Sequence, residues 1–165
     1  MTTMGQNPAA QIIVVSDRAL TDPGENRAGP VIQLALEAAG CEVASSIVAS
    51  DADSVAKALR AAVATARVVI TIGGTGIRPG DVVSDQTAAL GLLELPGIAE
   101  EIRRRGAAKT GVALLSRAHA GLVETPEGRV FVLNAPSSRG GARDVAELLA
   151  ELLPDLLRDL SGRPR

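Results

Sequence analysis

Short runs of aliphatic residues, bounded by turn-forming residues, alternate along this chain with longer stretches of helical periodicity. Such short apolar runs predict buried β-strands, and they occur at residues 12–15, 41–49, 68–70, 112–116 and 129–134. The intervening pattern predicts helices at residues 30–40, 55–66, 84–93 and 98–105 and from residue 142 onward. Strands that alternate with helices indicate an α/β fold, and we expect three layers, α/β/α, around a mostly parallel sheet.

Three details of this pattern concern individual residues. In the first helix, the buried apolar stripe is expected to run through Val31 and Leu34. The last helix carries a long leucine stripe, and Pro154 inside it is expected to kink or split the helix, because proline removes a backbone hydrogen bond. A polar turn at residues 125–128 is expected to join the last two strands.

Composition narrows the classes of function. The length favours one domain, residues 1–165, with residues 1–10 and 162–165 expected to be flexible. Aromatic residues make up 1% of the chain and the net charge is −2, so base stacking and attraction to phosphate backbones are weak, and we expect no nucleic-acid partner. The apolar runs are shorter than the ~20 residues of a membrane span, and the polar start lacks a signal segment, which favours a cytoplasmic protein without membrane contact.

Three features that might suggest chemistry have simpler structural interpretations. Cys41 is the only cysteine, so the chain forms no internal disulfide, and its apolar neighbours predict a buried inert thiol. His119 is the only histidine and is expected on the surface rather than in a metal site. Arginines 103–105 lie at the end of a predicted helix, where cations favour the helix dipole and a solvated position.

The chain is organised around residues 66–87, in which a buried strand runs into Gly73-Gly74-Thr75-Gly76 and then reaches Asp81. Glycines allow positive φ and bring backbone N–H groups close to an anion, and the Thr75 hydroxyl adds a donor. A carboxylate at Asp81 suits Mg²⁺ or a proton. A bare Gly-Gly-Thr-Gly segment is equally consistent with a tight turn that binds no ligand, and an aspartate here with a turn or cap residue.

Three of the predicted strands end in polar segments. Ser16 follows the first strand, the glycine loop at residues 73–76 follows the third, and residues 134–139 follow the last. Because the carboxyl ends of parallel strands meet at one edge, we expect these segments to form a site for a small phosphate-bearing ligand, assisted by a metal ion. Asp51 follows the second strand, where an aspartate is usually an N-cap.

Several short motifs occur in a specific order along the chain. The pattern T-x-GGTG-x-x-P-x-D is met by Thr71, residues 73–76, Pro79 and Asp81. Further elements are Ser16-Asp17-Arg18, then Pro96, Gly97 and Glu100, and then Leu115, Ser116, Arg117 and Gly121. In this order the motifs resemble the MogA/MoaB family of molybdenum-cofactor biosynthesis, which is related to the G domain of gephyrin-type proteins. The resemblance covers the whole ordered chain and implies the α/β fold of that family.

The resemblance implies a protein that binds molybdopterin and adenylylates its phosphate with Mg²⁺ and ATP, releasing pyrophosphate. It implies that Asp51 and Asp81 are catalytic and hold the Mg²⁺ ion. The residues expected to bind phosphate or substrate are Ser16, Gly73, Gly74, Thr75, Gly76, Glu100, Ser116, Arg117, Asn134, Ser137, Ser138 and Arg139. The family is typically trimeric, which implies a homotrimer or a dimer of trimers, with other proteins of cofactor biosynthesis as further partners.

Some positions depart from the family pattern. Val83-Ser84 stands where the family has Thr-Pro, Asn26 replaces an acidic residue, Ser50 replaces a proline, and residues 134–138 read Asn-Ala-Pro-Ser-Ser instead of Asn-Leu-Pro-Gly-Ser. These changes keep two other functions open beside the enzyme. One is a paralogue that binds molybdopterin without adenylylating it, and the other is an oligomeric scaffold with a degenerate site.

Overall fold

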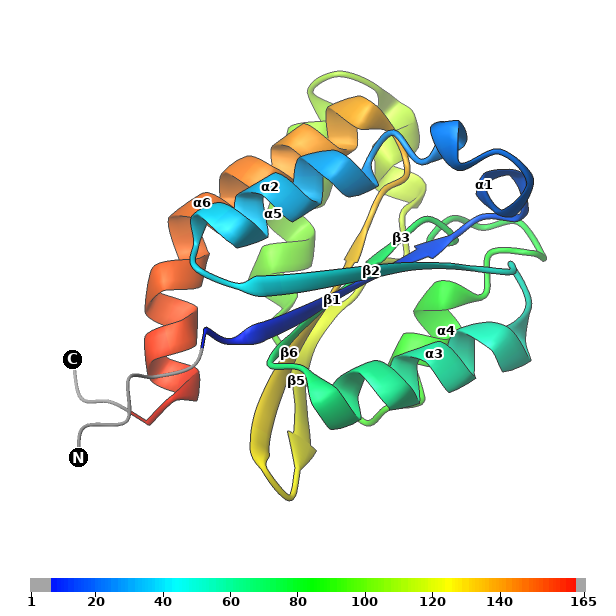
Figure 1. Ribbon diagram of the computed structural model, residues 1–165. Coiled ribbons are helices and arrows are strands. Elements are labelled where there is room, and N and C mark those ends of the chain that lie inside the picture. Colours follow the sequence, from blue (N-terminus) through cyan, green and yellow to red (C-terminus); the bar gives the residue numbers. More distant parts are fainter. Residues whose placement is uncertain (1–6, 163–165) are drawn as a thin grey trace.

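The computed structural model describes residues 7–162, which form one six-stranded sheet flanked by helices (Figure 1). The strands are β1 (Ala9–Val15), β2 (Glu42–Val48), β3 (Val68–Ile72), β4 (Leu93–Glu94), β5 (Ala120–Thr125) and β6 (Gly128–Ala135). The α-helices are α1 (Asp17–Thr21), α2 (Gly29–Ala38), α3 (Ala52–Thr65), α4 (Val83–Ala88), α5 (Pro96–Ala107) and α6 (Arg139–Leu160). Two short 3₁₀ helices are η1 (Pro23–Glu25) and η2 (Gly111–Leu115).

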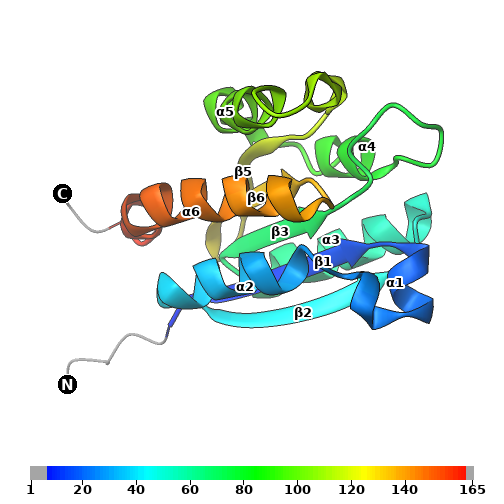
Figure 2. The same ribbon diagram turned by 90° about the horizontal axis from the view of Figure 1, so that it is seen from above.

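The sheet has the strand order β2-β1-β3-β6-β5-β4. Strands β2, β1, β3 and β6 run parallel, whereas β5 is antiparallel to both of its neighbours, β6 and β4. Helices α2, α5 and α6 cover one face of the sheet, and α3 and α4 cover the other (Figure 2). The predicted three-layer arrangement around a mostly parallel sheet is confirmed. It places the carboxyl ends of β1, β3 and β6 side by side.

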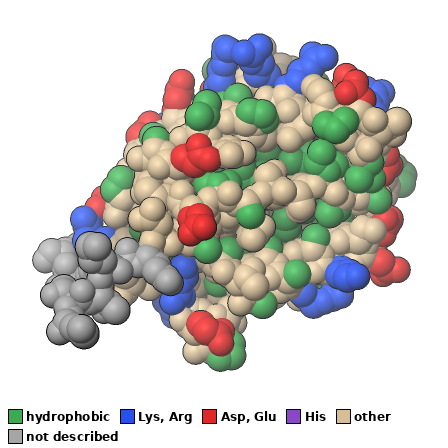
Figure 3. Space-filling view, in the orientation of Figure 1, with side chains coloured by type: hydrophobic (Ala, Val, Ile, Leu, Met, Phe, Trp, Pro, Cys, Tyr) green, Lys and Arg blue, Asp and Glu red, His purple; other side chains and the backbone are tan. Residues whose placement is uncertain are grey.

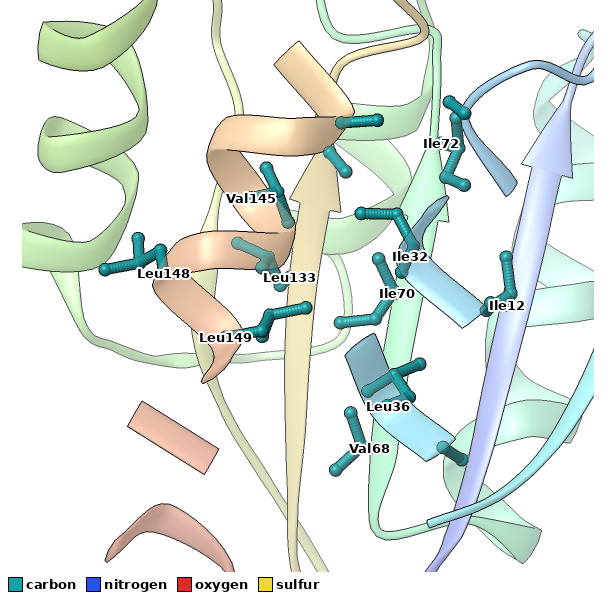
Figure 4. Packing of buried hydrophobic residues seen from close by; sticks show 14 of the residues in the cluster. Ile12, Ile32, Leu36, Val68, Ile70, Ile72, Leu133, Val145, Leu148 and Leu149 are labelled. Carbon is teal, nitrogen blue, oxygen red and sulfur yellow. The ribbon is translucent and has the colours of Figure 1, made fainter. Parts of the chain in front are cut away.

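The central strands supply two hydrophobic cores, one on each face of the sheet. In β1, Ile12 packs toward α2 and α6, and its neighbour Ile13 packs toward α3, as expected for side chains that alternate along a strand. Figure 4 shows the first core, in which Ile32 and Leu36 of α2 lie over the sheet near Ile70. Burial on both faces explains why these parallel strands are continuous apolar runs in the sequence.

Helix α2 buries a different stripe from the predicted one. Leu34 is 67% exposed, whereas Ile32 and Leu36 are completely buried. Residues four apart lie on the same face of a helix, so Ile32 and Leu36 form the face that packs on the sheet. The prediction of a stripe through Leu34 was wrong because aliphatic residues surround most of α2, and periodicity alone does not select the buried face.

The strand predicted at residues 112–116 is also wrong, because these residues form η2. Val112 and Leu114 are exposed there, at 70% and 65%. The antiparallel partner of β6 is β5, and the turn at residues 125–128 joins these two strands. The apolar composition of η2 suggested a strand, but β4 and β6 already pair with both edges of β5, so no sheet edge is open to η2 there.

The ends of the chain differ in part from expectation. Residues 9–10, expected to be flexible, belong to β1, while residues 1–6 and 163–165 lie outside the described residues. Helix α6 continues through Pro154, so the proline does not split it, although Figure 1 shows its red end turned away from the direction of its orange start. Cys41 is buried as predicted, and burial raises the pKa of its thiol. Within residues 7–162, no helix is both long and apolar enough to span a membrane.

Candidate functional site

The segments that follow β1, β3 and β6 lie against one another at the carboxyl edge of the sheet. The N–H group of Gly73 donates to the carbonyl of Ala135 at 3.0 Å, which joins the end of β3 to the end of β6. A Cβ atom at Gly73 would lie 2.9 Å from the carbonyl oxygen of Val15 and 3.7 Å from the Cβ of Ser137. The glycine loop therefore lies between the other two segments, and the predicted convergence of the three is confirmed.

A cavity of about 870 Å³ opens beside this loop. Its walls are the glycine loop, the second half of α5 together with η2, and the start of α6. The predicted site residues that line it are Gly73, Gly74, Thr75, Gly76, Asp81, Ser116, Ser137 and Ser138. Figure 3 shows Lys and Arg side chains gathered along the upper edge of the molecule, over the segment between α5 and β5.

The glycine loop has a backbone that other residues would not adopt. Gly73 and Gly74 have φ values of 92° and 65°, in the left-handed region that side chains disfavour. A Cβ atom at Gly74 would lie 2.5 Å from Cγ2 of Val83, which is a steric clash. The sharp turn and the close approach to α4 therefore both require glycine at position 74.

The carbonyl groups of residues 74–76 are bound to the rest of the protein. The N–H of Val83 donates to the carbonyl of Gly74 at 3.1 Å. Arg117 donates its backbone N–H to the carbonyl of Thr75 at 2.7 Å and its Nε to the carbonyl of Gly76 at 2.8 Å. Within residues 7–162, the N–H groups of Gly74, Thr75 and Gly76 donate to no protein acceptor. Three backbone donors therefore remain for a ligand on the cavity wall.

Asp81 places a carboxylate directly against the loop. Its Oδ2 lies 2.6 Å from the position that a Cβ atom of Gly76 would occupy, so a larger residue at position 76 would displace this side chain. The same oxygen accepts a hydrogen bond from the backbone N–H of Arg78 at 3.0 Å. Among the described residues, Oδ1 of Asp81 accepts no hydrogen bond. One oxygen thus orients the carboxylate, and the other is available to a ligand.

Arg117 holds the loop instead of lining the cavity. Its Nη2 donates to the carbonyl of Asp81 at 2.8 Å, and its Nη1 donates to Oδ1 of Asp85 at 2.9 Å. The hydrogen bonds from Arg117 lower the pKa of Asp85, and Asp85 raises the pKa of Arg117 in return. The guanidinium was predicted to contact the substrate, but its donors bind the loop backbone and Asp85, so we assign it a positioning role.

The start of α6 forms the wall opposite η2. Ser138 is the N-cap, and its Oγ accepts a hydrogen bond from the N–H of Gly141 at 3.1 Å. A Cβ atom at Gly141 would lie 2.4 Å from Cγ of Pro136, so the turn into the helix is tightly packed. The first N–H groups of a helix lack intrahelical acceptors, so those at residues 139–140 add donors on this side.

Asn134 was predicted to bind substrate, but its side chain is completely buried. Its Nδ2 donates to the hydroxyl groups of Thr71 at 2.8 Å and Thr87 at 2.9 Å. Its Oδ1 accepts a hydrogen bond from the N–H of His119 at 2.9 Å. The amide joins β3, α4 and the start of β5 beneath the site. Asn134 is not part of the cavity lining, so the predicted contact of its side chain with a substrate was wrong.

The structure does not bring Asp51 and Asp81 into one cluster. Asp51 is exposed, caps α3 by accepting a hydrogen bond from the N–H of Ser54 at 2.8 Å, and lies outside the cavity lining. The hydrogen bonds from Ser54 lower its pKa. Because β1 separates β2 from β3, the ends of these two strands lie about 10 Å apart. Within residues 7–162, no three His, Cys, Asp or Glu side chains cluster so that they could hold a metal ion.

Three other predicted residues lie near the cavity but not in its lining. Ser16 caps α1 by accepting a hydrogen bond from the N–H of Ala19 at 3.1 Å. Glu100 and Arg139 are exposed, on α5 and at the start of α6. Their roles toward a ligand stay predictions.

Sequence reasoning missed several charged residues of the cavity. Arg78, Arg103 and Lys109 line it together with the carboxylate of Asp144. Arg103 was expected to be a solvated helix end, but its Nη1 donates to the carbonyls of Ser116 at 3.4 Å and Ala118 at 3.1 Å. No motif marks these residues. Together with the free N–H groups of residues 74–76, the cations make the cavity suited to a ligand that carries phosphate.

The comparisons with known proteins agree with this chemistry. Residues 11–157 match a family described as a probable molybdopterin binding domain. Over 140 residues the chain is 33% identical to the molybdopterin adenylyltransferase of Pyrococcus furiosus, which covers 84% of this chain and 82% of that protein. Over 145 residues it is 32% identical to the molybdenum cofactor biosynthesis bifunctional protein of Chlorobaculum tepidum, covering 87% of this chain and 45% of that protein. The chain thus spans less than half the length of the bifunctional relatives that it matches.

Among solved structures, the molybdopterin biosynthesis Mog protein of Mycobacterium ulcerans is 36% identical and has a TM-score of 0.86. The match covers 96% of this chain and 100% of that chain. The family match over residues 11–157 includes every residue that lines the cavity. The chain belongs to the MogA/MoaB family of molybdenum-cofactor biosynthesis proteins.

Proposed function

We propose that this chain binds molybdopterin in the cavity beside the glycine loop and adenylylates its phosphate with Mg²⁺ and ATP, releasing pyrophosphate. The observation that carries the proposal is the loop itself. The carbonyls of residues 74–76 are bound to the protein, while their N–H groups, in residues that line the cavity, have no acceptor within residues 7–162. The relative from Pyrococcus furiosus, which is named a molybdopterin adenylyltransferase, supports the reaction.

Backbone donors and cations of the cavity wall supply what this chemistry needs. Transfer of an adenylyl group is largely positioning and neutralisation of charge, so fixed N–H donors and cations are the groups that it needs. The N–H groups of residues 74–76 would hold phosphate oxygens, and Arg103 would balance their charge. Arg117 keeps the loop carbonyls turned away from the ligand.

The residues present fit a Mg²⁺ ion that arrives with ATP. This ion is usually held in proteins by one or two carboxylates together with substrate phosphates, rather than by a cage of protein ligands. Asp81 fits that pattern, because its Oδ1 has no hydrogen-bond donor among the described residues. Bound Mg²⁺ would neutralise charge on the phosphates. Asp51, predicted as the second catalytic and Mg²⁺-holding residue, follows β2, whose end lies about 10 Å from the end of β3, a distance that a triphosphate chain spans.

The test is to mix purified protein with molybdopterin, Mg²⁺ and ATP and to measure pyrophosphate. We expect one pyrophosphate per molybdopterin consumed, and an Asp81→Asn variant that binds molybdopterin but loses most of the turnover. Full turnover by Asp81→Asn would refute the mechanism. Asp51→Asn tests the second aspartate in the same assay, and Asp53→Asn is its matched control, since Asp53 lies in the first turn of α3 near Asp51.

A second candidate is a protein that binds molybdopterin without adenylylating it. The position of Asp51, outside the cavity lining and occupied as the cap of α3, favours this reading. The serine at position 137, where the family pattern has glycine, does not favour this reading. Among residues 7–162 only glycines have a positive φ, so the backbone of Ser137 is not strained. Binding of molybdopterin by calorimetry, without pyrophosphate release under any nucleotide, would establish the binding protein in place of the enzyme.

The homotrimer, or a dimer of trimers, also stays a proposal. Support comes from large apolar side chains that the monomer leaves exposed, among them Leu34, Ile77, Val112 and Leu114. Burial of such side chains is a common driving force for association. Light scattering during size-exclusion chromatography measures the mass directly, and a monomer at micromolar concentration would contradict the proposal. The cytoplasmic location likewise stays a prediction.

A further inference from the structure

Asp144 is a carboxylate in the second turn of α6 that lines the cavity and is only 6% exposed. Its Oδ1 accepts a hydrogen bond from Nζ of Lys109 at 2.5 Å. Its Oδ2 has no hydrogen-bond partner among residues 7–162. A buried carboxylate oxygen without a donor costs free energy. Such an oxygen at the wall of a cavity points to a ligand that brings a hydrogen-bond donor.

The carboxylate is held in place from two sides. Val145 and Leu148, which follow it on α6, pack into the core beneath the helix and set its rotation (Figure 4). Lys109 follows α5, and its backbone N–H donates to the carbonyl of Gly106 at 3.0 Å. The Lys109 side chain itself is 58% exposed, so it balances the charge of Asp144 from the solvent side and leaves the second oxygen free.

The substrate of the proposed function carries a group of matching chemistry. A pterin ring has an amino-pyrimidinone edge, on which a ring N–H and an exocyclic NH₂ group point in the same direction. A carboxylate accepts two parallel N–H donors at once, as it does from arginine. The corresponding edge of adenine pairs an NH₂ donor with a ring nitrogen that is an acceptor. A carboxylate would therefore bind both donors of the pterin edge. Against adenine, one of its oxygens would face the ring nitrogen, and two acceptors repel each other.

We propose that Asp144, held by Lys109, binds the amino-pyrimidinone edge of the pterin ring and so orients the substrate and excludes adenine from its place. The proposal rests on the proposed function for the identity of the ligand. The N–H groups of residues 74–76 then bind the phosphate at the other end of the substrate. The cavity lining thus contains both an acceptor for a donor-rich ring and backbone donors for an anion.

The test compares two fluorescent ring systems that differ in one group. 6-Carboxypterin carries the exocyclic NH₂ group, and 6-carboxylumazine carries an oxygen at the same place, so it sets an acceptor against Asp144. By fluorescence titration we expect the wild-type protein to bind the pterin about 10-fold or more tightly, the scale of a hydrogen bond to a charged group. Asp144→Asn should lose most of this preference, because an amide offers one donor and one acceptor.

Asp155→Asn is the matched control, because it makes the same substitution on the exposed side of α6 and should keep the wild-type preference. Titration with Mg²⁺ and ATP should give the same affinity in the wild type and in Asp144→Asn, and thermal melting shows that both variants fold. The comparison of the two rings in the wild-type protein needs no variant, so it tests the proposal even if Asp144→Asn does not fold.

Each outcome decides something different. Equal affinity of the wild type for both rings, or a preference that survives in Asp144→Asn, overturns the assignment of Asp144 and leaves the proposed function standing. Binding of molybdopterin without measurable affinity for 6-carboxypterin also overturns it, because the ring edge then contributes nothing. Failure of the wild type to bind molybdopterin itself contradicts the proposed function instead.

Discussion

The two walls of the cavity differ in how their functional groups are built. The glycine loop presents backbone N–H groups from a contiguous segment, residues 74–76, and its shape is held by Arg117. The helical wall presents side chains from separate elements, Lys109 after α5 and Asp144 on α6. A contiguous loop leaves a motif in the sequence. A pair of residues that are 35 positions apart leaves none until the fold brings them together.

The two walls also differ in how well they should tolerate amino-acid substitutions. The loop depends on backbone conformations that only glycine adopts, so substitution there should damage both the fold and the site. The helical wall depends on side-chain chemistry at positions that the core already fixes, so substitution there should change the ligand preference and leave the fold intact. We expect the effects of four substitutions to decrease from the glycine loop and the buried residue beneath it to a surface residue outside the cavity.

The largest effect is expected for Gly74→Ala. The new Cβ would lie 2.5 Å from Val83, and the φ of 65° disfavours any side chain, so we expect a loss of about 2–4 kcal/mol of unfolding free energy. Denaturant titration measures the loss, and pyrophosphate release should disappear with it. Gly80→Ala is the control, since a Cβ at Gly80 has no atom within 4 Å. A stable, active Gly74→Ala variant would show that the loop tolerates rearrangement.

A loss of similar size, about 2–4 kcal/mol, is expected for Asn134→Ala, because it leaves the buried hydroxyls of Thr71 and Thr87 and the N–H of His119 without their partner. Asn26→Ala is the control, since Asn26 accepts a single hydrogen bond from the N–H of Gly29, and it should cost about 1 kcal/mol. Asn134 does not reach the cavity, so the folded variant should keep the wild-type affinity for molybdopterin. A specific loss of affinity with unchanged stability would restore its predicted binding role.

A smaller effect, on turnover, is expected for Arg117→Lys. Lysine keeps the charge but lacks the planar fork that bonds the carbonyls of Gly76 and Asp81, so we expect kcat to fall about 10-fold while stability changes by less than about 1 kcal/mol. Arg129→Lys, on the exposed β5–β6 hairpin, is the control. Wild-type kcat in Arg117→Lys would mean that the loop keeps its shape without the clamp.

The smallest effect concerns Glu101, which lies outside the cavity. Hydrogen bonds from Arg104 and then Arg105 lower the pKa of Glu101 from 4.5 to about 2. A lowered folded-state pKa stabilises the protein above the unfolded-state pKa, and that stabilisation is lost as the pH falls from about 4.5 toward 2. Wild type and Glu101→Gln should therefore differ slightly at pH 7 and converge in acid, by denaturant titration, whereas Glu127→Gln should match the wild type throughout. A difference that keeps its full pH 7 size at pH 2 would contradict this account.

Much of the fold was open to prediction because its central strands are buried on both faces. Continuous apolar runs are the signature of such strands, and they located β1, β3 and β6. The edge strand β2, which is largely exposed, was also predicted in place. The errors fall where local pattern is ambiguous. Helix α2 is apolar around most of its surface, and η2 is as apolar as a strand although its side chains are exposed.

The residues of the candidate site likewise divide into those that a local motif predicted and those whose placement depends on tertiary packing. Gly73 to Gly76 and Asp81 were recognised because a ligand-binding turn confines its glycines and its acid to a few consecutive positions. Asn134 was also predicted from a motif, but its side chain points into the protein interior. The direction of a side chain at a strand end depends on the elements that pack beside it. Asp51 was placed at the correct edge of the sheet, yet its distance from Asp81 depends on the strand order.

The sequence by itself determined the layer architecture, the position of the glycine loop and the family, since each depends on residues that are close along the chain. Only the tertiary structure decided which cations face the cavity, that Arg117 clamps the loop, and that Lys109 meets Asp144. These are contacts between elements far apart in sequence. Their geometry is set by how the helices pack on the sheet, and no local pattern encodes it.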